Sequence, residues 1–323
     1  MRIAVDAFGG DNAPAAVVEG CIDALKKYPD MSVTLCGDEE RIKAELEKYR
    51  YDVARVDILH APEIISCDEQ PTFAIRKKKD SSLVKAMELV RDGKADCVVS
   101  AGSTGAVLAG ATFIIKRIEG VKRPAIGVVF PAEKGCVLIM DCGANVDCKP
   151  SYLQQFAVMA SAYMHDIMGV DNPRVGLLNK AAYKLLEQTP VNFAGNCEAR
   201  EILSGGFDAI VCDGFAGNIV LKYTEGLAAT LMGMLKKELM ADTRSKLGAA
   251  MAKPAFRRFK KVMDYTEYGG APLLGIDGGV IKAHGSSNAK AFAAALGQAR
   301  SFASSGTNET IRRAVKSLPE VAD

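Results

Sequence analysis

The stretch Cys97-Val-Val-Ser-Ala-Gly-Ser-Thr-Gly-Ala-Val-Leu-Ala109 decides the fold of this 323-residue chain. Its apolar run Cys97–Val99 predicts a buried strand, and the small residues from Thr104 onward predict a helix. The turn between them contains glycines, which let a backbone approach a ligand closely, and hydroxyl groups, which donate hydrogen bonds. Free amide groups at the start of a helix also favour an anion. The turn therefore fits the floor of a phosphate site, or equally a tight turn in which Ser103 or Thr104 caps the helix.

Four further expected strands are also followed by polar turns that contain glycine. The strands are Ile3–Val5, Val137–Asp141, Ala209–Cys212 and Val280–Ala283, and the turns are Asp6–Pro14, Asp141–Pro150, Asp213–Asn218 and His284–Asn288. Alternating strands and helices predict an α/β fold, and open sheets of this class bind ligands at the carboxyl ends of parallel strands. At Asp6, a role in the site and a role in shaping the loop remain equally open.

Two turns are expected to form hairpins. Pro131-Ala-Glu-Lys-Gly135 separates the apolar runs Pro124–Phe130 and Val137–Asp141. This pattern predicts a hairpin at the edge of the sheet. Gly278-Gly279 predicts a second hairpin turn, directly before the strand Val280–Ala283.

The composition is that of a soluble globular protein, with 49% hydrophobic and 25% charged residues. The nine cysteines contain no Cys-x-x-Cys pair, so we expect reduced thiols in the cytoplasm rather than a metal site or disulfides. Met1 leads directly into a strand, which does not resemble a signal peptide, and we expect no membrane span. The net charge of +2 neither favours nor excludes a nucleic-acid partner, and we expect none.

Residues 227–263 predict a helical hairpin that docks on another surface. Leucine and methionine residues form one stripe of its first helix, from Leu227 to Leu239. Residues 244–261 then carry seven Lys or Arg residues and no acidic one, with Phe256 and Phe259 among them. A packed hairpin with a solvated basic face is one interpretation. We favour a docking surface for an acidic partner or an anionic membrane, in which Arg257 and Arg258 supply charge.

Taken together and in order, the turns resemble one family over almost the whole chain. The motifs that carry the resemblance are Asp6-Ala-Phe-Gly-Gly-Asp11, Ser100-Ala-Gly-Ser-Thr-Gly-Ala106, Asp141-Cys-Gly-Ala-Asn145, Gly195-Asn-Cys-Glu-Ala-Arg200, Asp213-Gly-Phe-Ala-Gly-Asn-Ile-Val-Leu-Lys222, Gly269-Gly-Ala-Pro-Leu-Leu-Gly275 and His284-Gly-Ser-Ser-Asn288. The family is that of the bacterial phosphate acyltransferases, which transfer an acyl group from acyl carrier protein to phosphate in phospholipid synthesis. One departure is that the usual Gly-x-Glu-x-x-Lys-Gly segment is missing after Asn179, where Lys180-Ala-Ala-Tyr183 follows directly. The segment is either deleted or missing from this sequence.

The resemblance implies a single domain, residues 1–323, with a three-layer α/β/α sandwich. This fold is similar to that of the isopropylmalate dehydrogenases and phosphotransacetylases, here with the protruding hairpin. It implies transfer of a long-chain acyl group from acyl carrier protein to inorganic phosphate, without a cofactor or metal. The acyl phosphate would serve glycerol-3-phosphate acylation, with the downstream acyltransferase as a further partner. A homodimer in the cytoplasm, in peripheral contact with anionic membrane, is also implied.

This chemistry requires phosphate to be held against a thioester carbonyl, and donors for the oxyanion that develops. The expected catalytic residues are His284, Asn218, Lys222 and Asn145. The expected substrate-binding residues are Asp6, Gly102, Ser103, Thr104, Gly105, Lys149, Asp213, Ser286, Ser287 and Asn288. Among these, His284 is a candidate acceptor for the phosphate proton. A nucleophilic Cys142 or Cys148 paired with His284 is a less favoured alternative.

Two other functions compete with acyl transfer. A dehydrogenase on the related fold is disfavoured because the fingerprint Gly-x-Gly-x-x-Gly is absent from the first turn. A non-catalytic scaffold, docking carrier protein and membrane through residues 227–263, would not require several convergent polar turns.

Overall fold

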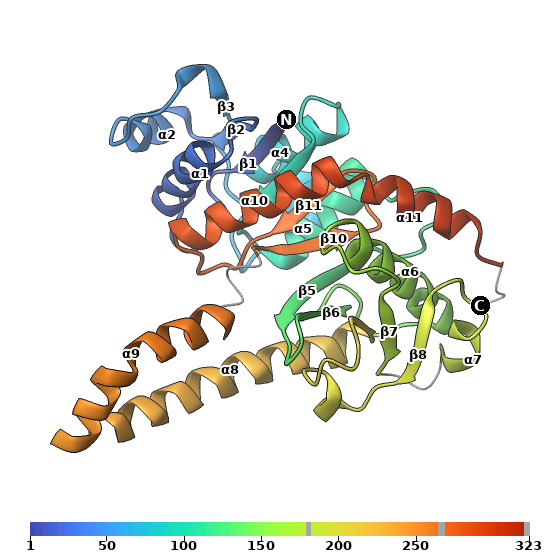
Figure 1. Ribbon diagram of the computed structural model, residues 1–323. Helices are drawn as coiled ribbons and strands as arrows, with labels where there is room; N and C mark the ends of the chain where they lie inside the picture. Colours follow the sequence, from blue (N-terminus) through green and yellow to red (C-terminus); the bar gives the residue numbers. More distant parts are fainter. Residues whose placement is uncertain (179–181, 264–268, 320–323) are drawn as a thin grey trace.

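The computed structural model describes residues 1–178, 182–263 and 269–319. Within these residues, eleven strands form one mixed sheet in the order β3-β2-β1-β4-β11-β10-β5-β6-β9-β7-β8 (Figure 1). The segment after Asn179, where the chain departs from the pattern that it resembles, lies outside the described residues.

The sheet consists of two parallel groups that run in opposite directions. The first group is β1 (Arg2–Asp6), β2 (Ser32–Gly37), β3 (Val56–His60), β4 (Cys97–Ser100) and β11 (Gly279–Lys282). The second is β6 (Cys136–Met140), β9 (Ala209–Val211), β7 (Arg174–Leu177) and β8 (Asn192–Asn196). Between them, β10 (Ala271–Leu274) and β5 (Ala125–Pro131) pair antiparallel with each other and with their outer neighbours, which reverses the direction. The polar turns therefore come from both groups rather than from one edge.

Both predicted hairpins are confirmed, but one prediction of position was wrong. β5 and β6 are joined at Pro131 and Cys136, as the turn sequence indicates. However, β5 also pairs with β10, and β6 pairs with β9. This hairpin therefore lies in the middle of the sheet, because both of its strands are apolar enough to be covered on two faces.

Helices cover both faces of the sheet and make it the middle of three layers (Figure 1). Ile3 and Val5 of β1 face one core, and Ala4 between them faces the other, as the strand period of two requires. The first core is covered by α1 (Ala15–Lys27), α2 (Glu39–Leu46), α6 (Pro150–Asp166), α7 (Tyr183–Leu186), α10 (Ala289–Ser305) and α11 (Thr307–Lys316). The second is covered by α3 (Pro71–Lys77), α4 (Ser82–Arg91), α5 (Thr104–Gly110) and the π-helical turn Ala111–Ile115 that continues it.

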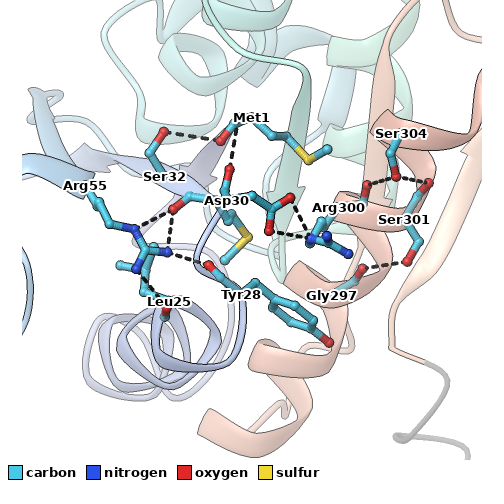
Figure 2. A network of polar contacts seen from close by, with 11 residues as sticks. Met1, Leu25, Tyr28, Asp30, Ser32, Arg55, Gly297, Arg300, Ser301 and Ser304 are labelled. Atoms are coloured by element: carbon cyan, nitrogen blue, oxygen red, sulfur yellow. Dashed lines mark hydrogen bonds and ion pairs between the residues drawn. The ribbon is translucent and has the colours of Figure 1, made fainter.

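Polar contacts link the end of α1 to Arg55 and to α10, within the helical layer that covers the first core (Figure 2). Arg55 donates to the carbonyl oxygens of Leu25, Tyr28 and Met31, at 3.0, 2.5 and 2.9 Å. A cationic donor suits the carbonyls of Leu25 and Tyr28 at the end of α1, which lack partners within the helix. Asp30 accepts from Arg300 at 2.9 Å and so links the turn after α1 to α10.

The helices α8 (Gly214–Leu239) and α9 (Thr243–Met263) form the hairpin and project from the body (Figure 1). α8 begins directly at the polar turn Asp213–Asn218, which was expected to open a helix, and it continues into the first helix of the predicted hairpin. Of its 26 residues, the buried ones are Gly214 and Gly217. In the described part of the chain, no helix is both long and apolar enough to cross a bilayer.

Candidate active site

A cavity of about 420 Å³ lies where the two strand groups meet. Four predicted site residues from three segments line it, namely Thr104 of α5, Asn218 and Lys222 of α8, and His284. Apolar side chains form much of the remaining wall, including Ile126, Val128, Val129, Phe130, Val146, Phe215 and Leu221. The cavity therefore combines a polar end with an apolar wall, which is the usual constitution of a small-molecule site.

The turn at residues 100–105 is held from beneath by a buried carboxyl group. Ser100 Oγ donates to Asp6 Oδ2 at 2.6 Å and accepts from the amide of Gly102 at 3.0 Å. Burial raises the pKa of the Asp6 carboxyl above its usual range, while the bond from Ser100 opposes this rise. Asp6 is 2% exposed, so it shapes the turn and does not line the cavity.

Ser103 is the residue that precedes α5, but its hydroxyl makes no capping hydrogen bond. The interpretation of Ser103 as an ordinary cap is therefore wrong. Thr104, the first residue of α5, lines the cavity directly. Gly102 and Gly105 flank these hydroxyls. A side chain at Gly105 would meet Pro71, at 2.6 Å from Cγ, so the turn packs closely against α3.

Asn145 is placed as a turn-forming residue and not as an oxyanion donor. Its Nδ2 donates to Asp141 Oδ2 at 2.9 Å and to the carbonyl oxygen of Pro124 at 2.8 Å. These bonds use both hydrogens of the amide. Asp141 is fully buried and also accepts from the amides of Ile126, Ala144 and Asn145. This organising role of Asp141 was not among the predicted roles, although an acid directly after an apolar strand is a recognisable signal.

His284 lies at the mouth of its turn and is oriented by Ser286. Its Nδ1 accepts from the amide of Ser286 at 3.3 Å and lies 2.8 Å from Ser286 Oγ. An Nδ1 that accepts from an amide leaves the proton of the neutral ring on Nε2. His284 can therefore donate a hydrogen bond from Nε2 to a ligand. The expected role was the opposite one, that of a proton acceptor.

Ser287 and Asn288 hold the same turn rather than line the cavity. The carbonyl oxygens of Ser286 and Ser287 each accept from Asn12 Nδ2 at 3.2 Å. Asn288 caps α10, because its Oδ1 accepts from the amide of Ala291 at 2.9 Å. These contacts fix the position of His284 beside the turn at residues 100–105.

The remaining predicted residues belong to the two helix starts of the second group. Asp213 caps α8 by accepting from the amide of Ala216 at 2.8 Å. Lys222 lines the cavity and forms an ion pair with Glu225 at 2.9 Å, and Asn218 lies one turn before it. Lys149 precedes α6 and does not line the cavity.

The nucleophilic cysteine is not supported by its surroundings. Cys142 lines the cavity, but burial raises the pKa of its thiol well above the ordinary value. Burial likewise raises the pKa of Cys148 to about 12. Because the thiolate is the nucleophilic form, neither residue is poised to attack a thioester at neutral pH. In the described residues, no cluster of three His, Cys, Asp or Glu side chains is arranged to hold a metal ion.

Lys282 is a cavity residue that the sequence analysis missed. It ends β11, lines the cavity, and donates from Nζ to the carbonyl oxygens of Ala101, at 3.4 Å, and Ala283. Burial lowers the pKa of the Lys282 ammonium group to about 8. The available signal was a single lysine at the end of an apolar strand, two residues before His284.

The sequence is similar to a known family over almost its whole length. Residues 1–310 match the family model described as "Fatty acid synthesis protein". A phosphate acyltransferase of Clostridium botulinum is 54% identical, over 93% of each chain. One of Clostridium perfringens is 51% identical, over 94% of this chain and 93% of its own.

The fold is similar to that of solved phosphotransacylases. A phosphotransacetylase of Streptococcus pyogenes has a TM-score of 0.58 at 18% identity, over 98% of this chain and 94% of its own. A branched-chain phosphotransacylase of Enterococcus faecalis has a TM-score of 0.57 at 13% identity, over 94% of this chain and 99% of its own. These structures confirm the three-layer α/β/α fold. On the extent of the family match and the identity to named relatives, this chain belongs to the bacterial phosphate acyltransferases and is an acyltransferase of fatty acid and phospholipid synthesis.

Proposed function

We propose that the acyl donor is a long-chain acyl-[acyl carrier protein] and that the product is an acyl phosphate, used for glycerol-3-phosphate acylation. The observation that carries this proposal is a cavity that combines a polar end, at Thr104 and His284, with a wall of apolar side chains. The polar end suits phosphate, and the wall suits the first carbons of a fatty acyl chain.

In the proposed reaction, a phosphate oxygen attacks the thioester carbonyl carbon. A C–O bond forms and the C–S bond breaks, and the carrier thiolate leaves and takes up the proton that the hydrogen phosphate gives up. Ser103 and Thr104 donate hydrogen bonds to the phosphate. Asn218 and the Nε2–H group of His284 donate to the oxyanion, and Lys222 offsets negative charge. Positioning and fixed donors of this kind lower a barrier by roughly 10 kcal/mol together.

The test is release of the carrier thiol with and without inorganic phosphate. We expect release to require phosphate and to be accompanied by acyl phosphate. Equal release in phosphate-free buffer would indicate hydrolysis and contradict the proposal. Ser103→Ala with Thr104→Val removes two neutral donors, at a cost of roughly 1–3 kcal/mol. It should raise the KM for phosphate more than the KM for the carrier, whereas Ser304→Ala on the exposed face of α10 should change neither.

The hairpin is proposed to serve assembly and location. The apolar stripe of α8 is exposed at Leu227, Leu231 and Leu235, and we assign it to a homodimer contact. In α9, Arg257 and Arg258 are exposed and Phe259 is 49% exposed. We assign this face to anionic lipid at the inner surface of the cell membrane, with docking of carrier protein as a secondary use. The downstream glycerol-3-phosphate acyltransferase would then receive the product there.

Vesicles of anionic and of neutral lipid test this assignment. Phe256→Ala with Phe259→Ala should weaken anionic-vesicle binding selectively, because inserted Phe side chains contribute roughly 1.5–3 kcal/mol each. Reversal of charge at Arg257 and Arg258 should weaken both vesicle binding and carrier affinity, and added salt should weaken both as well. If the double Phe variant keeps full vesicle binding and loses carrier affinity, the face is a carrier dock.

A further inference from the structure

Lys282 reaches the phosphate turn from a strand that is distant in sequence. In the register of β4 and β11, Lys282 lies opposite Ser100, and the amide of Ala283 donates to the carbonyl oxygen of Ser100 at 2.9 Å. The Nζ atom then extends to the carbonyl oxygen of Ala101, the first residue of the turn proper. The ammonium group is thus fixed at the point where the turn opens into the cavity.

The hydrogen bonds of Nζ leave capacity for a ligand. An ammonium group has three donors. In the described residues, two of them are accepted by main-chain carbonyl oxygens, those of Ala101 and Ala283. Because Lys282 also lines the cavity, the third donor is available to a molecule bound beside Thr104.

The charge of Lys282 lacks a direct counter-ion within the described residues, where no carboxylate oxygen lies within 4.0 Å of Nζ. The charged and titratable groups that face it are Asp6 of β1, Asp11 of the following turn, Cys67 of the loop before α3, and Lys222 of α8. His284 follows on its own segment. A part-buried cation without a paired carboxylate is stabilised by an anionic ligand.

The two lysines that the sequence predicted for the site are less suited to binding an anion in the cavity. Lys149 does not line the cavity, and Lys222 is paired with Glu225 at 2.9 Å. Only a cation that is not already neutralised gains its full attraction to a phosphate group.

We propose that Lys282 is the cation that binds the phosphate group of the substrate and of the acyl phosphate product. This inference rests on the proposed function, since it assigns the phosphate end of the same cavity. The ammonium group binds the oxygens that do not attack and keeps its proton throughout, so it contributes charge and position and no proton transfer.

The pH dependence of binding follows from this role. With a pKa of about 8, the unliganded Lys282 loses its charge as the pH rises through 8. Phosphate affinity should therefore be highest below pH 8 and fall above it. Arginine at this position keeps its charge at every accessible pH, so Lys282→Arg should remove the fall.

The test measures direct binding of inorganic phosphate by calorimetry, without an acyl donor. Lys282→Met should raise the Kd for phosphate roughly 10- to 100-fold, as the loss of a charge-assisted bond requires. Lys282→Arg should retain most of the affinity at pH 7. The matched control is Lys94→Met, an exposed lysine before the opposite end of β4, which should bind as the wild type does.

Wild-type affinity in Lys282→Met would overturn the inference. A wild-type phosphate affinity that does not fall above pH 8 would also overturn it, and so would an equal fall in Lys282→Arg. A lysine that only holds the turn together gives no pH-dependent loss of phosphate affinity that arginine removes. If Lys282→Met does not fold, the pH comparison of the wild type with Lys282→Arg decides alone. Phosphate binding that depends on Lys282 without acyl transfer would contradict the proposed function and leave this inference standing. Acyl transfer together with phosphate binding that does not depend on Lys282 would support the proposed function and overturn this inference.

Discussion

Helices α6 and α8 begin alike and end in different surroundings. Each follows a polar turn, and each carries apolar side chains along much of its length. α6 is covered, with Phe156 and Tyr163 almost fully buried, whereas α8 packs on the body as far as Leu221 and then projects from it (Figure 1). An apolar helix face therefore requires a partner surface, but it does not specify which molecule supplies that surface.

The largest expected effect is on the covered helix. Phe156→Ala should lower the free energy of unfolding by about 3–5 kcal/mol, because Phe156 is 0% exposed and its removal leaves a cavity. Tyr223→Ala on α8 is the matched control, since Tyr223 is 68% exposed and its loss should change stability by less than about 0.5 kcal/mol. Denaturant unfolding measures both. Equal losses would show that α8 is part of the folding core after all.

Alkaline pH should sharpen the same contrast through Tyr163. Burial raises the pKa of this tyrosine from its ordinary value of 10 to about 12, and Gln298 Nε2 donates to its hydroxyl at 2.7 Å. The stability that the neutral form contributes is fully present below pH 10 and is lost as the pH rises toward 12. The loss amounts to roughly 2–3 kcal/mol, since each pKa unit corresponds to about 1.4 kcal/mol.

Unfolding measured between pH 9 and pH 12 tests this effect. Tyr163→Phe should remove the corresponding part of the alkaline destabilisation, whereas Tyr223→Phe on the uncovered helix should follow the wild-type profile. An unchanged alkaline profile in Tyr163→Phe would contradict the burial of its hydroxyl.

On α8, substitution should affect assembly instead of folding. Leu231 is 54% exposed in the single chain. Leu231→Gln should weaken self-association by about 1.5–3 kcal/mol, the value of burying one leucine, with little change in the unfolding of the single chain. Sedimentation equilibrium measures the association. A wild-type protein that remains a single chain at every concentration would refute the homodimer contact.

The smallest expected effect concerns the caps. Asn288→Ala at the start of the covered helix α10 should lower global stability by about 1 kcal/mol. Asp213→Ala removes an equivalent bond from α8, but the loss should appear as faster amide exchange in the first turn of α8, because little of α8 is packed on the core. Hydrogen exchange separates the two. Identical global losses would show that the start of α8 unfolds together with the sheet.

Several features of the site were predictable because they depend on neighbouring residues. The turn at residues 100–105 was identified from its glycines and hydroxyls, and His284 from its place after a strand, and both contribute to the cavity region. The oxyanion role of Asn145 could not be judged in this way. Its two acceptors, Asp141 and the carbonyl of Pro124, flank the open end of the predicted β5–β6 hairpin, and only the folded turn shows that they take both hydrogens of its amide.

The α/β class, the strand–turn–helix units and the existence of an apolar, basic hairpin can be predicted from the sequence. These follow from hydrophobic period, turn chemistry and charge, which act between residues close in the chain. The tertiary structure alone decided that the β5–β6 hairpin is central and that Lys282 lies beside Ala101. The pairing of β4 with β11 brings Lys282 to Ala101, about 180 positions away in the sequence. Which side chain faces which turn depends on the burial and direction of the assembled strands.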